Sequence, residues 1–189
     1  MQKIGVFGGT FDPIHIGHII LAQDVIEHVQ LDKIFFVVNY HPPHKKVYTS
    51  FEHRFNMVRL AITDHKDFVA SDIEKAQNIS PSYTYHSLCK LKELIPLAEL
   101  HLIIGSDQYN SFQTWYKYGE ILELVKLIVL KRPGYAPPKN ITNNVVFIDE
   151  RLIDISSTEI RERVKKGKSI KFMVPELVEE YIKKNKLYI

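Results

Sequence analysis

The segment GGTFDPIHIGH, residues 8–18, carries the residue types best suited to chemistry on a phosphate. Its glycines allow close backbone approach, so main-chain N–H groups ahead of a helix can face an anion. His15 and His18 are three residues apart, and both imidazoles can therefore point toward the same anion from one side of that helix. Two such donors can stabilise the charge that develops during phosphoryl transfer, which depends mainly on positioning and electrostatics.

A second anion-binding pattern, ISSTEIR, occupies residues 155–161 near the other end of the chain. Ser156 or Ser157 can cap a helix whose first N–H groups point outward, and Arg161 follows one turn later. Ser156 and Glu159 also have the spacing of an ordinary capping box, which alone would explain the pattern. Paired with the histidine segment, the pattern instead indicates a nest for an anion with a cation beside it.

Other ligand-binding patterns fit the sequence less well. The glycines at the start of the chain do not form the G-x-G-x-x-G of a dinucleotide site, and the GKS at 167–169 lacks the earlier glycine of a P-loop. His15 with His18, and His41 with His44, have the spacing of zinc ligands. Neither pair has an evident acidic or thiol third ligand, so no metal site built from the protein is predicted.

Alternating strands and helices must position these segments. Apolar, β-rich runs predict strands at 3–7, 34–38, 68–71, 100–104, 126–130 and 145–148. Apolar residues at helical spacing predict helices at about 15–29, 51–63, 83–94, 157–166 and 175–184. This order predicts an α/β, Rossmann-like doubly wound fold, with a mainly parallel sheet, helices on both faces and a helical C-terminal segment over about 155–189.

The predicted sheet also fixes where a ligand should bind. In doubly wound sheets the crevice lies outside the carboxyl ends of the strands, where the strand order reverses. Residues 8–18 follow the first predicted strand, residues 39–45 the second and residues 105–107 the fourth. We therefore expect these three segments to meet at one site.

Composition limits the class of protein. With 189 residues, 45% hydrophobic and 25% charged, the chain is expected to form a single domain over residues 1–189. One cysteine, Cys89, excludes a disulfide framework and favours a reducing compartment. A net charge of +3 is too mild to indicate nucleic acid, and no apolar run approaches the ~20 residues of a membrane helix. We expect a cytoplasmic protein with no nucleic-acid or membrane partner.

Together, the two motifs resemble the signatures of the nucleotidyltransferase superfamily, in which H-x-G-H and I-S-S-T-x-I-R bind a nucleotide triphosphate. The chain is similar from end to end to the bacterial nicotinate-nucleotide adenylyltransferase family. Five further local matches carry that narrower resemblance: PPHK at 42–45, SYT at 82–84, IGSD at 104–107, WYK at 115–117 and KRPG at 131–134. The resemblance implies adenylyl transfer from ATP to nicotinate mononucleotide, giving nicotinate adenine dinucleotide and pyrophosphate.

The resemblance also implies a role for each matched residue. The expected catalytic residues, His15 and His18, contact the triphosphate around the α-phosphorus. The expected ATP-binding residues are Gly8, Gly9, Thr10, Phe11, Gly105, Asp107, Ile155, Ser156, Ser157, Thr158 and Arg161. The expected acceptor-binding residues are Asn39, Lys45, Thr84, Trp115, Tyr116 and Arg132. Mg²⁺ is expected to arrive with ATP, held mainly by phosphate oxygens and water.

Individual residues keep an ordinary structural interpretation beside the functional one. Trp115 could stack on the pyridine ring or simply pack in the core. Lys45 could bind phosphate or lie on a solvated loop. Asp107 and Arg132 could contact the substrates or form surface ion pairs.

Alternative functions also stay open. A pantetheine-phosphate adenylyltransferase, or another nucleotidyltransferase such as a cytidylyltransferase, would keep the nucleotide site and change the acceptor. A nucleotide-binding regulator without turnover, or an RNA-binding protein, would be a different class. The stretch from Arg151 onward has 10 basic and 6 acidic residues, but its lysines fit solvated helix faces without the aromatic residues that stack on bases. The abundant tyrosines and phenylalanines leave a homodimer open.

Overall fold

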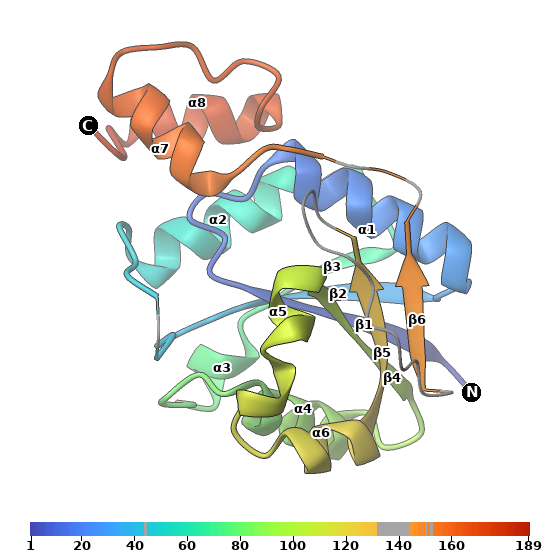
Figure 1. Cartoon of the computed structure of the whole chain (residues 1–189). Coiled ribbons are helices and arrows are strands. Elements are labelled where there is room, and N and C mark those ends of the chain that lie inside the picture. The colour runs from blue at the N-terminus through green and yellow to red at the C-terminus, as the bar shows by residue number, and fades with distance from the viewer. Residues whose placement is uncertain (44, 132–143, 150, 152) are drawn as a thin grey trace.

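A single sheet of six parallel strands forms the centre of the molecule (Figure 1). The computed structural model describes residues 1–43, 45–131, 144–149, 151 and 153–189. The strands are β1 (Lys3–Gly9), β2 (Lys33–Val38), β3 (Phe68–Ser71), β4 (Glu99–Gly105), β5 (Val125–Leu130) and β6 (Val145–Ile148). Their order is β3-β2-β1-β4-β5-β6, so the direction of winding reverses between β1 and β4. This is the doubly wound Rossmann order, which opens a crevice at the carboxyl ends of those two strands.

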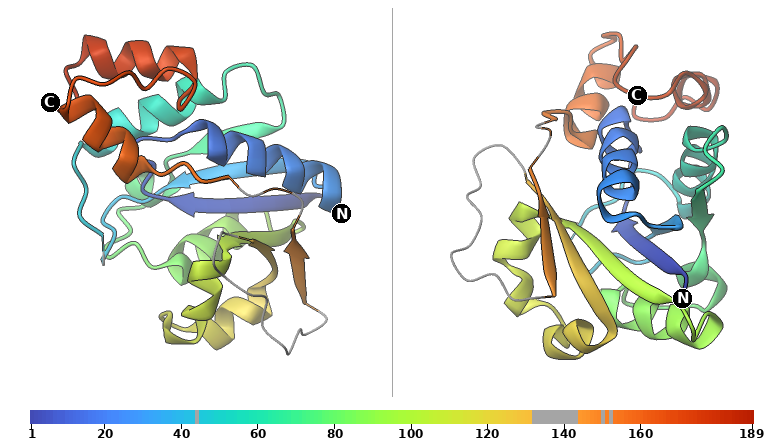
Figure 2. Two further views of the ribbon diagram at one scale, coloured as in Figure 1. Left: turned by 45° about the horizontal axis from the view of Figure 1, so that its top comes forward. Right: turned by 90° about the vertical axis from the view of Figure 1, so that its right-hand side faces the viewer.

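Helices cover both faces of the sheet (Figures 1 and 2). Those on one face are α1 (Ile16–Val29), α2 (Phe51–Ala61), α7 (Ser157–Lys165) and α8 (Glu176–Lys184). Those on the other are α3 (Ile73–Ala76), α4 (Thr84–Leu94), α5 (Ser106–Asn110), α6 (Tyr118–Leu124) and a 3-10 turn, Phe112–Thr114. The predicted fold class is therefore confirmed.

Alternation along the strands divides the core into two layers. On β4, Leu102 and Ile104 pack against the α4 side, whereas Ile103 packs against the α1 side. This follows from the pleat of a strand, which points successive side chains to opposite faces. Buried side chains of α8, including Val178 and Ile182, join the same layer as α1 and α2. The C-terminal segment thus packs against α2, on the same side of the sheet as α1 (Figure 2).

Each predicted strand and helix is present, with ends that differ by no more than two residues from the prediction. The short helices α3, α5 and α6 were not predicted. Helices of one or two turns are too short to establish the 3.6-residue periodicity on which the prediction relied. None of the helices in the part of the chain that the structure describes combines the length and the hydropathy of a membrane-spanning helix.

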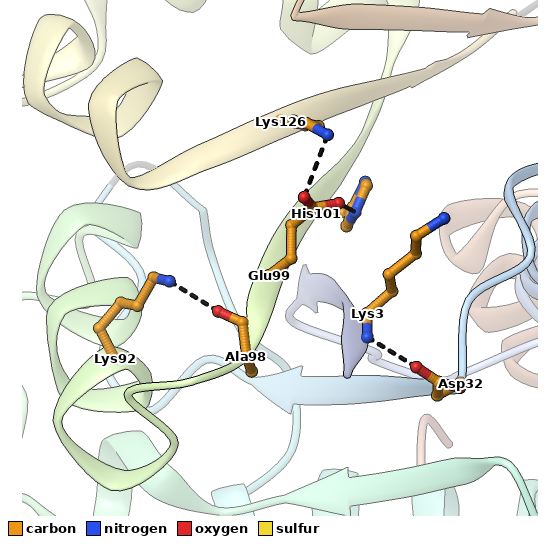
Figure 3. Close-up of polar contacts among 7 residues, drawn as sticks. All are labelled: Lys3, Asp32, Lys92, Ala98, Glu99, His101 and Lys126. Atoms are coloured by element: carbon orange, nitrogen blue, oxygen red, sulfur yellow. Dashed lines mark hydrogen bonds and ion pairs between the residues drawn. The ribbon is translucent and has the colours of Figure 1, made fainter. Parts of the chain in front are cut away.

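Polar groups at the amino ends of the strands form hydrogen bonds and ion pairs with one another (Figure 3). Glu99 lies between two partners: its Oε1 is 2.7 Å from Nε2 of His101 and its Oε2 is 3.1 Å from Nζ of Lys126. Beside them, the backbone N–H of Lys3 donates to Asp32 at 2.7 Å. Burial lowers the pKa of His101, although Glu99 acts in the opposite direction, and Lys126 lowers the pKa of Glu99. The charges at this end therefore stabilise one another.

Candidate active site

A cleft of about 680 Å³ opens outside the carboxyl ends of β1 and β4. It contains both expected catalytic residues and every expected ATP-binding residue, together with Lys45. The lining comes from the β1–α1 turn, the start of α5, residues 45–48 and residues 153–161. The fold thus gathers segments that are far apart in the sequence at the crevice predicted from the strand order.

The two motifs touch each other directly at the wall of this cleft. Oγ of Ser157 donates to the carbonyl of Pro13 at 2.8 Å, and Nη1 of Arg161 donates to the carbonyl of Asp12 at 2.7 Å. The expected cap is present, because Oγ of Ser156 accepts the N–H of Glu159 at 3.1 Å. The N-terminus of α7 and the Arg161 guanidinium therefore both lie at the cleft wall, where they favour an anion.

The two histidines form a pair at the start of α1. Their ring centroids lie 3.7 Å apart, and the backbone N–H of His15, the N-cap residue, donates to Nδ1 of His18 at 3.2 Å. Because Nδ1 accepts this hydrogen bond, Nε2 is the ring nitrogen that can donate. His18 is also held by ring contacts with Phe7 and Phe11, at 5.9 and 5.2 Å between centroids. The pair is thus oriented by backbone and packing together.

Gly17 leaves the space that the His15 ring needs. A Cβ at Gly17 would lie 3.1 Å from Nδ1 of His15 and 3.1 Å from Cγ2 of Ile153. Gly9 has a similar constraint, since its Cβ would lie 3.0 Å from the ring of Phe11. By contrast, a Cβ at Gly8 would meet nothing within 4 Å. Gly17 and Gly9 therefore allow close packing of the motif, whereas Gly8 keeps backbone exposed at the cleft.

Asp12 connects the β1–α1 turn to two distant parts of the chain. Its carboxylate is 2% exposed and accepts from the N–H of Tyr48 at 2.6 Å, Oγ1 of Thr49 at 2.8 Å and the hydroxyl of Tyr188 at 2.7 Å. Burial and the neighbouring Asp12 carboxylate raise the pKa of Tyr188. These bonds hold the loop that carries Lys45, and the C-terminal segment, against the turn.

The roles of three buried charged side chains, Asp12, Arg54 and Glu74, were not predicted from the sequence. Arg54 was detectable, because it shares the helical stripe of Phe51, Val58 and Ala61 and so interrupts an otherwise apolar face. Asp12 gave no such signal, since its partners lie 36 to 176 residues away. Glu74 belongs to the short helix α3, which was itself not predicted.

The expected acceptor-binding residues divide into two groups. Lys45 lines the cleft, whereas Asn39, Thr84, Trp115 and Tyr116 lie outside its lining. Tyr116 is 43% exposed and stacks on Tyr83 at 4.8 Å, next to Thr84 in the first turn of α4. Trp115 is half-buried against Phe112, at 5.2 Å between rings. Arg132 and His44 lie outside the described residues.

Comparison with known proteins identifies the family. A model of the Cytidylyltransferase-like family matches residues 6–163. The nicotinate-nucleotide adenylyltransferase of Bacillus subtilis (strain 168) is 40% identical over 190 residues, covering 100% of this chain and 99% of that protein. The fold matches the Plasmodium falciparum nicotinic acid mononucleotide adenylyltransferase complexed with NaAD, with a TM-score of 0.85 and 24% identity over 100% of this chain and 98% of that one. The chain belongs to the nicotinate-nucleotide adenylyltransferase family.

Proposed function

We propose that this chain transfers the adenylyl group of ATP to nicotinate mononucleotide, giving nicotinate adenine dinucleotide and pyrophosphate. The observation that carries the proposal is the contact between the two motifs, in which Arg161 and Ser157 bind the carbonyls of Asp12 and Pro13. This contact supports one anion-binding cleft formed by both ends of the chain. The name of the 40% identical relative supports the acceptor.

The proposed reaction develops negative charge that the cleft must stabilise. A phosphate oxygen of nicotinate mononucleotide attacks the α-phosphorus of ATP, and the bond from that phosphorus to the bridging oxygen of the β-phosphate breaks, so pyrophosphate leaves. Negative charge builds on the α-phosphoryl and leaving oxygens, which preorganised donors stabilise. We assign this role to His18, through Nε2–H, and to His15, with Arg161 and the N-terminus of α7 binding the phosphates. Gly8 to Phe11, Gly105 and Asp107 would bind the rest of ATP.

A divalent metal ion generally accompanies ATP in nucleotidyltransferases, and we propose Mg²⁺ here. Among the described residues, no group of three or more His, Cys, Asp or Glu is arranged to hold a metal. The Asp12 carboxylate already accepts three hydrogen bonds within the protein. The residues fit an ion that is coordinated mainly by phosphate oxygens and water, which is typical of Mg²⁺ bound with a nucleotide. When bound, such an ion neutralises part of the triphosphate charge.

On the acceptor side we propose that Lys45 contributes positive charge for phosphate and that Trp115 stacks on the pyridine ring. Thr84 and the backbone near Tyr116 would donate N–H groups to the nicotinate carboxylate, and Asn39 would contact the same substrate. The first turn of α4 offers such donors, since Thr84 is its first residue. Arg132 keeps its proposed role in phosphate binding on the resemblance alone.

We also propose a cytoplasmic location and leave a homodimer as a prediction. The single cysteine supports a reducing compartment. Sedimentation velocity of the purified chain measures the assembly directly, and a species of 22.0 kDa would reject the dimer.

Pyrophosphate release tests the activity. Purified chain is incubated with ATP and Mg²⁺ plus nicotinate mononucleotide, its amide analogue or phosphopantetheine, and release is followed with each acceptor. We expect the highest kcat/KM with nicotinate mononucleotide. Turnover only with phosphopantetheine would reject nicotinate mononucleotide as the acceptor. If none of the three acceptors gives pyrophosphate release while ATP still binds, the result would support a nucleotide-binding regulator.

A further inference from the structure

Arg54 is a charged side chain that the proposed chemistry leaves unused. It projects from α2, is 1% exposed and lies beneath the turn that follows β1. Burying a guanidinium is costly unless its hydrogen-bonding groups find partners. Burial does lower the pKa of Arg54, and the nearby Asp12 and Glu74 carboxylates act in the opposite direction. The partners of this side chain therefore indicate why it is buried.

One nitrogen of Arg54 joins the two substrate segments. Nη1 donates to the carbonyl of Thr10 at 2.9 Å and to the carbonyl of Asn39 at 2.7 Å. Thr10 belongs to the expected ATP-binding turn and Asn39 to the expected acceptor loop. The last backbone bond between these segments runs from the N–H of Asn39 to the carbonyl of Gly9 at 2.9 Å. Arg54 thus links the two segments immediately after the backbone hydrogen bonds between β1 and β2 end.

Glu74 extends this connection to the acceptor side. Its carboxylate, also 1% exposed, accepts Nδ2 of Asn39 at 3.1 Å and the N–H of Tyr40 at 2.8 Å. It also accepts Oγ of Ser87 on α4 at 2.7 Å. Since Thr84 begins α4, one set of buried hydrogen bonds runs from the nucleotide turn through Arg54 and Asn39 to the helix expected to bind the acceptor.

We propose that Arg54 is a positioning residue that fixes the nucleotide turn relative to the acceptor loop, so that the attacking phosphate and the α-phosphorus are aligned. The inference rests on the proposed function, because it assigns the two segments to the two substrates. Transfer between bound reactants is sensitive to misplacement of about 1 Å, which can cost roughly 10²-fold in rate. Arg54 touches neither reactant and acts only through the carbonyls that it holds.

The test compares Arg54→Lys and Arg54→Met with a matched control on the same helix, Arg59→Met, whose side chain is exposed. Steady-state kinetics are measured against ATP and against nicotinate mononucleotide, with Tm for each variant. We expect Arg54→Met to lower kcat by roughly 10²-fold and Arg54→Lys, which keeps a buried donor, by roughly tenfold, with both KM values within about threefold of the original chain. Arg59→Met should leave kcat and both KM values unchanged.

Each outcome decides the proposal. Unchanged kcat in Arg54→Lys and Arg54→Met would overturn it, as would raised KM values at unchanged kcat, which would indicate a loss of binding alone. If Arg54→Met does not fold, Arg54→Lys decides by the same criterion. If the unsubstituted chain shows no turnover with nicotinate mononucleotide, the proposed function is rejected instead. Failure of the Arg54 proposal and failure of the proposed function are therefore distinguishable.

Discussion

The two ends of the sheet use histidine in opposite ways. At the amino end, Nε2 of His101 is 2.7 Å from a carboxylate that also binds Lys126, and the ring is 3% exposed. At the carboxyl end, the rings of His15 and His18 lie 3.7 Å apart between centroids, tilted by 33°, and line an open cleft with Arg161. The first arrangement satisfies charge internally, which supports stability. The second holds donors toward a space that an anion can enter, which suits the catalytic role that we propose for these residues.

His18→Ala should produce the largest effect at the cleft. Because one preorganised donor is lost, kcat should fall by roughly 10²- to 10³-fold. Tm should change little, since His18 is half-buried and its ring packs at the cleft edge. Kinetics and thermal unfolding measure the two quantities. His101→Gln is the matched control, for which we expect a lower Tm at unchanged kcat; near-normal turnover in His18→Ala would refute its catalytic role.

Trp115→Ala tests the acceptor side of the proposed site. Stacking on an aromatic ring contributes about 1–3 kcal/mol, so the KM for nicotinate mononucleotide should rise roughly tenfold. The KM for ATP should stay within about twofold, since Trp115 lies outside the cleft lining. Both constants come from the pyrophosphate assay, and an unchanged acceptor KM would leave Trp115 with a packing role against Phe112.

Gly17→Ala should have a moderate effect. The new Cβ would lie 3.1 Å from Nδ1 of His15, so the ring must shift by a few tenths of an ångström. We expect roughly a tenfold loss of kcat, less than for a full 1 Å misplacement. Gly119→Ala on α6 is the control, because its Cβ meets nothing within 4 Å and alanine favours a helix. The control should leave kcat unchanged. If Gly17→Ala also leaves kcat unchanged, turnover tolerates displacement of the His15 ring.

The smallest effect is on the pH dependence of stability at the amino end. Burial lowers the folded-state pKa of His101, so the unfolded chain binds more protons as pH falls below roughly 6.5. The stabilisation from neutral His101 is therefore full above that pH and is lost as pH falls through the folded-state pKa. In unfolding titrations from pH 8 to 5, His101→Gln should show a shallower slope. An identical slope would assign the acid sensitivity to other groups.

Regular periodicity and short motifs made much of this molecule predictable. Strands such as 68–71 and 145–148 have the predicted bounds, and Ser156 caps the predicted helix. The place of Arg54 on the apolar stripe of its helix indicates that this side chain is buried, whereas the partners of the buried charges were not predictable. Arg59 lies on the same helix outside that stripe, and its side chain is exposed. Which carbonyls Arg54 binds depends on where two strands end in space, which a single sequence does not encode locally.

The contact between Arg161 and Asp12 also determines when the nucleotide site can form during synthesis. The two residues are 149 positions apart in the chain. At the roughly 5–20 residues per second of translation, about 7 to 30 s separate the appearance of the first from that of the second. A ribosome-bound chain that has released only β1 and α1 has its histidines but lacks the serines and Arg161 that adjoin them at the cleft. A nucleotide that binds at this cleft would therefore stabilise the finished chain and not such an intermediate.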